Sequence, residues 1–271
     1  MNLLQKKLIK PIEKRIKERK YQKVLPTNPL GEDIYLVSFP KSGNTWLRFL
    51  VANAIKLKYN IEREVNFFSI QEVIPDIHLS KNIRSQGVFG RTDLPRIIKS
   101  HTSYNPYYHR VILLVRDPKD AIVSYYYYTK ERNSINPDWT ISQFIRSEKY
   151  GIKAWLKHTQ SWYLTLKQGQ NIQIINYETL VANPQQQIAN IMDLLGITME
   201  EHTLEKAIIL SSKSKMKDSE NKHRSTYIIQ NKSRQFVRDK KAQRGKDLSE
   251  ADREYIENMT RELAQKLGYD Y

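Results

Sequence analysis

The sequence predicts an α/β fold, in which a central parallel sheet is flanked by helices and a phosphate-binding loop follows the first strand. Two observations lead to this prediction. Short and almost wholly apolar runs recur along the chain, as expected for strands buried on both faces. Between them lie longer segments with helical spacing of apolar residues, and this alternation is typical of parallel sheets. We place the strands at residues 34–39, 96–99, 110–116 and 172–175.

Helical segments follow these strands. The first runs from Trp46 to Lys58 and carries its apolar residues on one face. Asp117 and Pro118 predict the start of another helix, because aspartate caps helix N-termini and proline suits the first helical position. The remaining predicted helices cover residues 139–147, 151–167, 184–195 and 249–267. A long connection, residues 60–95, shows little periodicity, and connections of this kind are often functional.

Composition narrows the class of protein. The chain has 271 residues, 39% of them apolar, which suits one sizeable domain with a packed core. It has no cysteine, which excludes disulfides and thiolate metal sites and fits the cytoplasm, the location that we expect. No apolar run reaches the roughly 18 residues that a membrane span needs. The net charge of +16 predicts an anionic partner: nucleic acid, an anionic membrane surface or a multiply charged small molecule.

Two regions of the chain are especially basic. Residues 1–24 have the pattern of a basic amphipathic helix, which packs on the domain by one face or makes a weak contact with an anionic membrane. We therefore divide the chain into this segment and a domain of residues 25–271. Within the domain, residues 211–247 are basic and poor in pattern, and we predict that they form a lid over a cofactor or substrate.

The loop after the first strand, residues 39–46, reads FPKSGNTW. A short loop between a strand and a helix presents unpaired N–H groups and the positive end of the helix dipole, which suits phosphate. Gly43 permits a close backbone approach, and Lys41 adds a positive charge. Ser42 and Thr45 offer hydroxyl groups. The lysine precedes the glycine, unlike in the GxxxxGK[ST] loop of nucleotide triphosphatases, and this weakens the hypothesis that the chain is a kinase or ATPase. Taken alone, the loop is also compatible with a surface turn.

A second cluster of polar residues, RDPKDAIVS, spans residues 116–124. Arg116 lies at the carboxyl end of a predicted strand, where ligands of open α/β sheets gather. Ser124 lies about two turns into the following helix, so both side chains can reach one anion. Arginine gives phosphate a forked and permanently charged contact. The alternative is that Arg116 pairs with Asp117 or Asp120 and that Ser124 is only a helix-surface residue.

Together the two motifs resemble those of the PAPS-dependent sulfotransferases of the cytosolic type, here as a bacterial-like member. That family carries a YPKSGTTW-like loop and an RNPKDxxVSYY-like segment, and the resemblance runs from about Ile34 to the C-terminal helix. It implies transfer of a sulfuryl group from 3′-phosphoadenosine 5′-phosphosulfate (PAPS) to a hydroxyl or amine of an acceptor. The implied second product is adenosine 3′,5′-bisphosphate (PAP). No metal is implied, and the chain shows no ligand cluster with the spacing of a metal site.

The resemblance also implies which residues bind the donor. Lys41 would contact the bridging oxygen and stabilise charge on the departing phosphate. Arg116 and Ser124 would bind the 3′-phosphate. The residues implied to cradle the 5′-phosphate are Ser42, Gly43, Asn44 and Thr45. Those implied to lie near the adenine are Trp46 and Tyr177.

The basic lid matches the family less closely. Ser211 and Met216 belong to a run that resembles the family's TSFxxMK element, although Lys213 stands where an aromatic residue is usual. Arg238 lies in FVRDK, which resembles FxRKG, and it is our preferred lid ligand of the donor. Gly245, preceded by arginine, is the alternative match to that element after a small insertion.

A histidine supplies the expected base. His101 ends the run IKSH, which resembles the family's K-[ST]-H element at the end of a strand, and the resemblance implies that it removes the acceptor's proton. An imidazole suits this role, because its pKa lies near neutral pH. Lys99 is the third expected catalytic residue, where it either lowers the proton affinity of His101 or binds the sulfuryl oxygens.

Two other functions compete with sulfuryl transfer. A phosphoryl-transfer enzyme of the P-loop kinase type would use ATP and magnesium, and a nucleic-acid binder would depend steeply on salt. The acceptor is open among phenols, sugar hydroxyls, lipid headgroups and peptides, with the basic regions favouring an anionic or glycan-like one. The run Tyr125–Tyr128 can direct at most two side chains into one pocket, because successive helical residues point in different directions.

Overall fold

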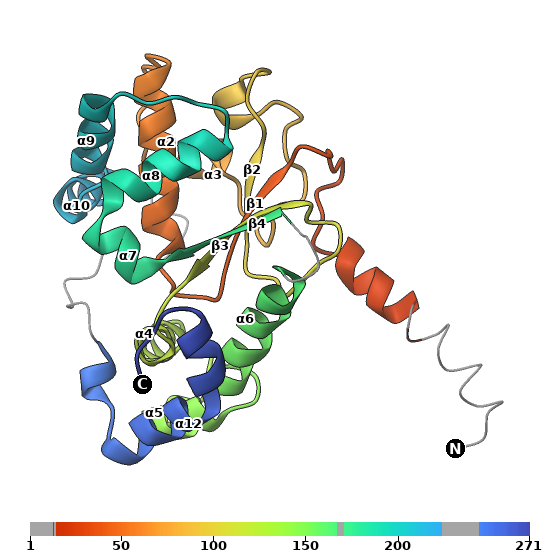
Figure 1. Cartoon of the computed structure of the whole chain (residues 1–271), viewed down its shortest axis with the longest axis vertical. Helices are drawn as coiled ribbons and strands as arrows, with labels where there is room; N and C mark the ends of the chain where they lie inside the picture. The colour runs from red at the N-terminus through yellow and green to blue at the C-terminus, as the bar shows by residue number, and fades with distance from the viewer. Residues whose placement is uncertain (1–12, 14, 167–170, 224–243) are drawn as a thin grey trace.

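A four-stranded parallel sheet forms the centre of the molecule (Figure 1). The computed structural model describes residues 13, 15–166, 171–223 and 244–271. The strand order is β2-β1-β3-β4, and every neighbouring pair is parallel, which confirms the predicted α/β class. The strands are β1 (Ile34–Ser38), β2 (Ile97–Ser100), β3 (Arg110–Val115) and β4 (Asn171–Asn176).

Helices cover both faces of this sheet (Figure 1). One face carries α2 (Asn44–Lys58), α3 (Ile70–Val73), α7 (Tyr177–Ala182), α8 (Pro184–Leu194), α9 (Glu201–Leu210) and α10 (Lys213–Lys222). The other face carries α4 (Pro118–Glu131), α5 (Ile141–Arg146), α6 (Ile152–Leu166) and α12 (Glu250–Lys266). Two short 3₁₀ turns are η1 (Val88–Gly90) and η2 (Arg244–Asp247).

Each face of the sheet has its own hydrophobic core, because successive strand residues point to opposite sides. In β1, Ile34 and Leu36 pack with α2, α8 and α9, whereas Tyr35 and Val37 pack with α4, α6 and α12. All four side chains are buried. Burial on both faces explains why the strands are continuous apolar runs and could be placed from the sequence.

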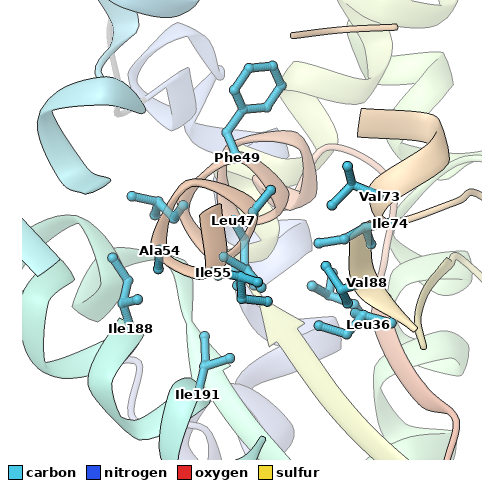
Figure 2. Packing of buried hydrophobic residues seen from close by; sticks show 14 of the residues in the cluster. Leu36, Leu47, Phe49, Ala54, Ile55, Val73, Ile74, Val88, Ile188 and Ile191 are labelled. Carbon is cyan, nitrogen blue, oxygen red and sulfur yellow. The ribbon is translucent and has the colours of Figure 1, made fainter. Parts of the chain in front are cut away.

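Helix α2 fills the first of these cores. Figure 2 shows it between Val73 and Ile74 on one side and Ile188 and Ile191 of α8 on the other. The helix begins directly after the loop that the sequence analysis singled out. Its packing therefore fixes the helix N-terminus, and with it the loop, relative to the sheet.

The predicted strands and helices lie within two residues of observed ones at the bounds given above. Helices α3, α7 and α9 were not predicted. Helix α10 lies in the region predicted to be poor in pattern, where only Met216 and Glu220 of its ten residues are buried. Such a polar helix leaves no periodic apolar signal in the sequence.

The described part of the N-terminal segment contacts the domain. Residues 15–22 are helical. The amide of Asn105, in the loop between β2 and β3, donates to the carbonyl of Tyr21 at 3.1 Å. The Tyr108 hydroxyl donates to the carbonyl of Val24 at 2.7 Å. Among the described residues, no helix is both long enough and apolar enough to cross a membrane.

Candidate active site

The carboxyl ends of all four strands meet at one edge of the sheet, because the strands are parallel and in register. The loop of residues 39–43 follows β1, His101 follows β2, Arg116 follows β3 and Tyr177 follows β4. The fold thus brings the two sequence motifs and the expected base to a single edge. This edge is where open α/β sheets bind their ligands.

The loop after β1 has the backbone of an anion site. Lys41 and Gly43 have φ angles of 70° and 99°, in the left-handed region. Gly43 precedes α2 without a side-chain cap, so the first N–H groups of the helix are open to a ligand. The buried hydroxyl of Ser42 has no hydrogen-bond partner among the described residues. These donors suit a phosphate group held at the start of the helix.

Of the remaining loop residues, Asn44 and Trp46 donate hydrogen bonds to the rest of the fold, and Thr45 does not lie in the core. The Asn44 amide points back toward the sheet and donates to the hydroxyl of Ser38 at 3.1 Å. Thr45 is exposed at the start of α2. The indole N–H of Trp46 donates to the carbonyl of Ser211 at 3.0 Å, which ties α2 to the segment after α9. Any contact of Asn44 with a phosphate would therefore come from its backbone.

Tyr177 joins the two motifs. Its ring meets the ring of Trp46 edge to face, with 6.1 Å between centroids. The guanidinium carbon of Arg116 lies 4.6 Å from the Tyr177 ring centroid, in cation–π contact. A β-carbon on Gly43 would lie 2.3 Å from the same ring. Four predicted donor-binding residues thus form one contiguous group.

Arg116 is buried and held at its tip. One Nη donates to the carbonyl of Lys41 at 3.2 Å, and the other pairs with the Asp120 carboxylate at 2.9 Å. Asp120 also accepts from the backbone N–H of Gly245 at 2.8 Å, near the C-terminal end of the basic region. Arg116 thus pairs with Asp120, as one part of the alternative interpretation expected, whereas its other part, a Ser124 on the helix surface, does not hold. Ser124 is buried on α4, two turns from Arg116.

The tyrosine run places one ring at the site. The ammonium nitrogen of Lys41 lies 4.5 Å from the ring centroid of Tyr128. Arg132 approaches the same ring, its guanidinium carbon 4.2 Å from the centroid. In contrast, Tyr125 packs edge to face against Phe39 in the core, with ring centroids 5.6 Å apart. The two rings are neighbours, with centroids 6.4 Å apart, as expected for residues three positions apart on one helix face.

Two of the three residues expected to form the lid, Ser211 and Met216, are buried in the domain. Ser211 is buried, and its hydroxyl accepts a hydrogen bond from the Asn53 amide at 2.9 Å. Met216 is buried in the core around α2, to which Trp46 also packs. Arg238 lies outside the described residues.

His101 is held in one tautomer. Its Nδ1 lies 2.7 Å from the carbonyl oxygen of Ser38, so Nδ1 carries the proton and donates it to that oxygen. Nε2 is then the basic nitrogen. Burial, together with the positive charge of Lys99, lowers the pKa of His101 well below its usual range. A neutral imidazole in this tautomer is the form that a general base needs.

Lys99 pairs with a carboxylate that was not predicted from the sequence. Its ammonium group forms a buried ion pair with Asp76, from the connection between α3 and β2. Burial lowers the pKa of Lys99 although the Asp76 carboxylate opposes this. Burial favours the neutral form of Asp76, but Lys99 outweighs it and holds the pKa of Asp76 below its usual range. The two charges stay paired beside His101.

The family model of the sulfotransferase domain matches residues 31–268, which include every one of these strand ends. The chain belongs to the sulfotransferase family.

Curated sulfotransferases resemble the chain over about two thirds of its length. Mouse sulfotransferase 1B1 is 32% identical over 206 residues, which are 69% of this chain and 66% of that protein. Human sulfotransferase 1C2 is 25% identical over 207 residues, covering 72% of this chain and 69% of its own length. The family match favours sulfuryl transfer over the P-loop kinase alternative.

Solved structures share the sulfotransferase fold. Retinol dehydratase in complex with androsterone and PAP superposes with a TM-score of 0.68 at 15% identity, covering 95% of this chain and 88% of that one. A mouse sulfotransferase complexed with PAP gives a TM-score of 0.58 at 19% identity, covering 89% of this chain and 86% of the other.

Two residues beside the expected base were not predicted from the sequence. Asp76 and His78 come from the connection without periodicity, and only the tertiary fold brings them beside β2. One signal was present in the sequence: Asp76 and His78 have the same spacing as Lys99 and His101. Such a spacing places each pair on one face of an extended segment.

Proposed function

We propose that this sulfotransferase moves the sulfuryl group of PAPS to a hydroxyl or amine of a small-molecule acceptor. PAPS would supply an activated sulfuryl group attached to a good leaving group, the bisphosphate. The observation that carries the proposal is the meeting of the loop of residues 39–43, Tyr177 and Arg116 with His101 at one edge of the sheet. The solved relatives that are complexed with PAP support the same donor.

The residues present fit this donor. The open N–H groups at the start of α2 and the unpartnered hydroxyl of Ser42 would hold the 5′-phosphate. Arg116 and Ser124 would bind the 3′-phosphate, assisted by Arg238 from the basic region. The adenine would lie near Trp46 and Tyr177, with Ser211 and Met216 supporting that wall.

His101 would act as the base. Because its Nδ1 proton is held by the Ser38 carbonyl, Nε2 can accept the proton of the acceptor as its oxygen or nitrogen attacks. Lys41 would stabilise the negative charge that develops on the departing phosphate. Lys99 keeps His101 neutral through its charge, and its pairing with Asp76 prevents an uncompensated cation beside the base.

Ligand binding distinguishes the three candidate functions. Thermal shifts are measured with PAP, with magnesium and ATP, and with a random oligonucleotide. Selective stabilisation by PAP is the expected result, since only PAP carries both phosphates that the two motifs recognise. Stabilisation by magnesium and ATP alone would establish the kinase alternative instead, and equal binding of any polyanion would point to the nucleic-acid binder.

A second experiment tests the base. Turnover is measured with labelled PAPS over phenol, steroid, sugar and amine acceptors, for the wild type and His101→Ala. The variant is expected to lose about 10²–10⁴-fold in turnover while PAP still raises its melting temperature. His109→Ala changes an exposed histidine in the loop before β3 and is the matched control. Retained turnover in His101→Ala would refute the base assignment.

A further inference from the structure

A short segment of the connection between α3 and β2 lies along the outer edge of β2. The backbone N–H of Lys99 donates to the carbonyl of Pro75 at 2.8 Å, and the N–H of Ile77 donates to the carbonyl of Lys99 at 3.1 Å. Asp76 and Lys99 form a parallel bridge. The segment is therefore an extended addition to the sheet at the point where β2 ends.

This pairing aligns two pairs of side chains. Asp76 faces Lys99, and their charged groups form the buried ion pair. Two residues further along each chain, His78 lies beside His101, with ring centroids 6.1 Å apart and planes only 14° from parallel. The Asp76 carboxylate also accepts from the backbone N–H of His78 at 3.0 Å, which fixes the start of the turn at His78.

The His78 ring makes a directional contact with the residue proposed as the base. Its Nε2 accepts a hydrogen bond from the backbone N–H of His101 at 2.9 Å. His101 is the first residue after β2, so strand pairing does not supply a partner for this N–H. An accepting Nε2 carries no proton, hence His78 is also neutral and has its proton on Nδ1.

His101 is thereby held at two points. The Ser38 carbonyl holds its ring through Nδ1, and His78 holds its backbone through the N–H. Together these bonds determine where Nε2 of His101 points. A general base must lie within hydrogen-bond reach of the proton that it removes, and a displacement near 1 Å can lower a rate by about 10²-fold.

We infer that His78 is a positioning residue for the base, acting as the acceptor that fixes the backbone of His101. The inference rests on the proposed function of His101 as base. Asp76 supports the arrangement in two ways, through the N–H of His78 and through Lys99. Protonation of His78 would remove the acceptor, because both ring nitrogens would then be donors.

Two substitutions of His78 separate hydrogen bonding from bulk. His78→Gln retains an acceptor oxygen at about the place of Nε2, whereas His78→Leu removes it. We expect His78→Leu to lower kcat by about 10²-fold with the KM for PAPS unchanged, and His78→Gln to stay within about tenfold of the wild type. His109→Leu, at an exposed position outside the site, is the matched control and is expected to keep the wild-type kcat.

A measurement independent of turnover follows the hydrogen bond itself. Hydrogen exchange at the backbone N–H of His101 is expected to be faster in His78→Leu than in the wild type and to remain slow in His78→Gln. The thermal shift caused by PAP shows that each variant is folded. If His78→Leu does not respond to PAP, His78→Val is the second variant without an acceptor at the place of Nε2.

The inference is overturned by either of two results. One is a folded His78→Leu with wild-type kcat and unchanged exchange at His101. The other is a His78→Gln that is as impaired as His78→Leu, since the acceptor would then be irrelevant. Failure of the base assignment is distinguishable, because it appears as retained turnover in His101→Ala and leaves the exchange result unaffected.

Discussion

The ring of Tyr177 covers Gly43 so closely that a β-carbon at position 43 would lie 2.3 Å from Cδ2 of the tyrosine. Neither residue can yield easily. The φ angle of Gly43 is 99°, a conformation that side chains disfavour, and the ring is held by Arg116 on its face and by Trp46. Contact between the loop after β1 and the start of α7 therefore depends on the missing side chain of one glycine.

Gly43→Ala is expected to weaken PAP binding by at least about tenfold, since the left-handed backbone alone costs roughly 1–2 kcal/mol in a residue with a β-carbon. The dissociation constant is measured by calorimetry. Gly196→Ala is the matched control, because Gly196 also has a positive φ of 74° but has open space around it. It should lose stability and keep its affinity for PAP. Equal affinities in all three proteins would contradict the role of the close contact.

Lys99→Met is expected to shift the acid limb of the pH–rate profile upward. His101 acts when neutral, so activity is lost as the pH falls through the pKa of His101, which burial and Lys99 hold well below its usual range. Removing the ammonium group raises this pKa, and the Asp76 carboxylate, then unpaired, raises it further. The profile of kcat/KM against pH gives the position of the acid limb, and this position can be compared even where the maximum rate of the variant is lower. The exposed Lys81→Met is the control, and an unmoved limb in Lys99→Met would refute the coupling.

Arg96→Met is expected to lower the free energy of unfolding by about 3–5 kcal/mol, because it leaves a buried carboxylate without its partner. Arg96 donates two hydrogen bonds to Asp33, each of 2.6 Å, and both side chains are at most 2% exposed. Urea denaturation measures the change. Lys153→Met removes an exposed pair with Glu148 and should cost less than about 1 kcal/mol. Similar losses in both variants would contradict the argument from burial.

His158 is expected to make the protein less stable in mild acid. It is buried on α6, and burial lowers its pKa to about 3 although the backbone of Thr102 opposes this shift. The unfolded chain binds a proton near pH 6.5 while the folded chain does not, so stability falls as the pH drops from 6.5 toward 3. The contribution is about 1.4 kcal/mol per pH unit.

Denaturation at pH 7 and pH 5 tests this contribution. The loss of stability between the two values should be smaller in His158→Leu than in the wild type, by about 2 kcal/mol. His202→Leu changes a side chain that is exposed and should retain the wild-type dependence. An identical loss in wild type and His158→Leu would show that His158 does not remain neutral in the fold.

The strands and much of the site could be predicted because both depend on local sequence. A buried parallel strand such as β1 is a continuous apolar run, and ligands gather where such runs end. Arg116 and His101 were therefore placed correctly at strand ends. The start of α4 was predicted from its cap, and the Asp117 carboxylate does accept from the N–H of Lys119.

Other features depend on the tertiary fold, and local sequence did not determine them. The Arg116–Asp120 pair was one of several pairings that the sequence allowed. Helix α10 has almost no apolar face, so periodicity could not reveal it. His78 reaches His101 only because its segment adds to the edge of β2, and such pairing across 23 residues is not encoded by either stretch alone.

That added segment has a consequence for the molecule's surface. β2 is the outermost strand on its side, and an uncovered outer strand offers its backbone to the strands of other molecules. Pro75 and Ile77 occupy the N–H and the carbonyl of Lys99 that would otherwise be exposed there. The segment that carries His78 thus also discourages two copies from joining their sheets at this edge. Sequence changes in the connection of residues 60–95 must keep the backbone of Pro75 and Ile77 paired with Lys99 if the edge of β2 is to stay covered.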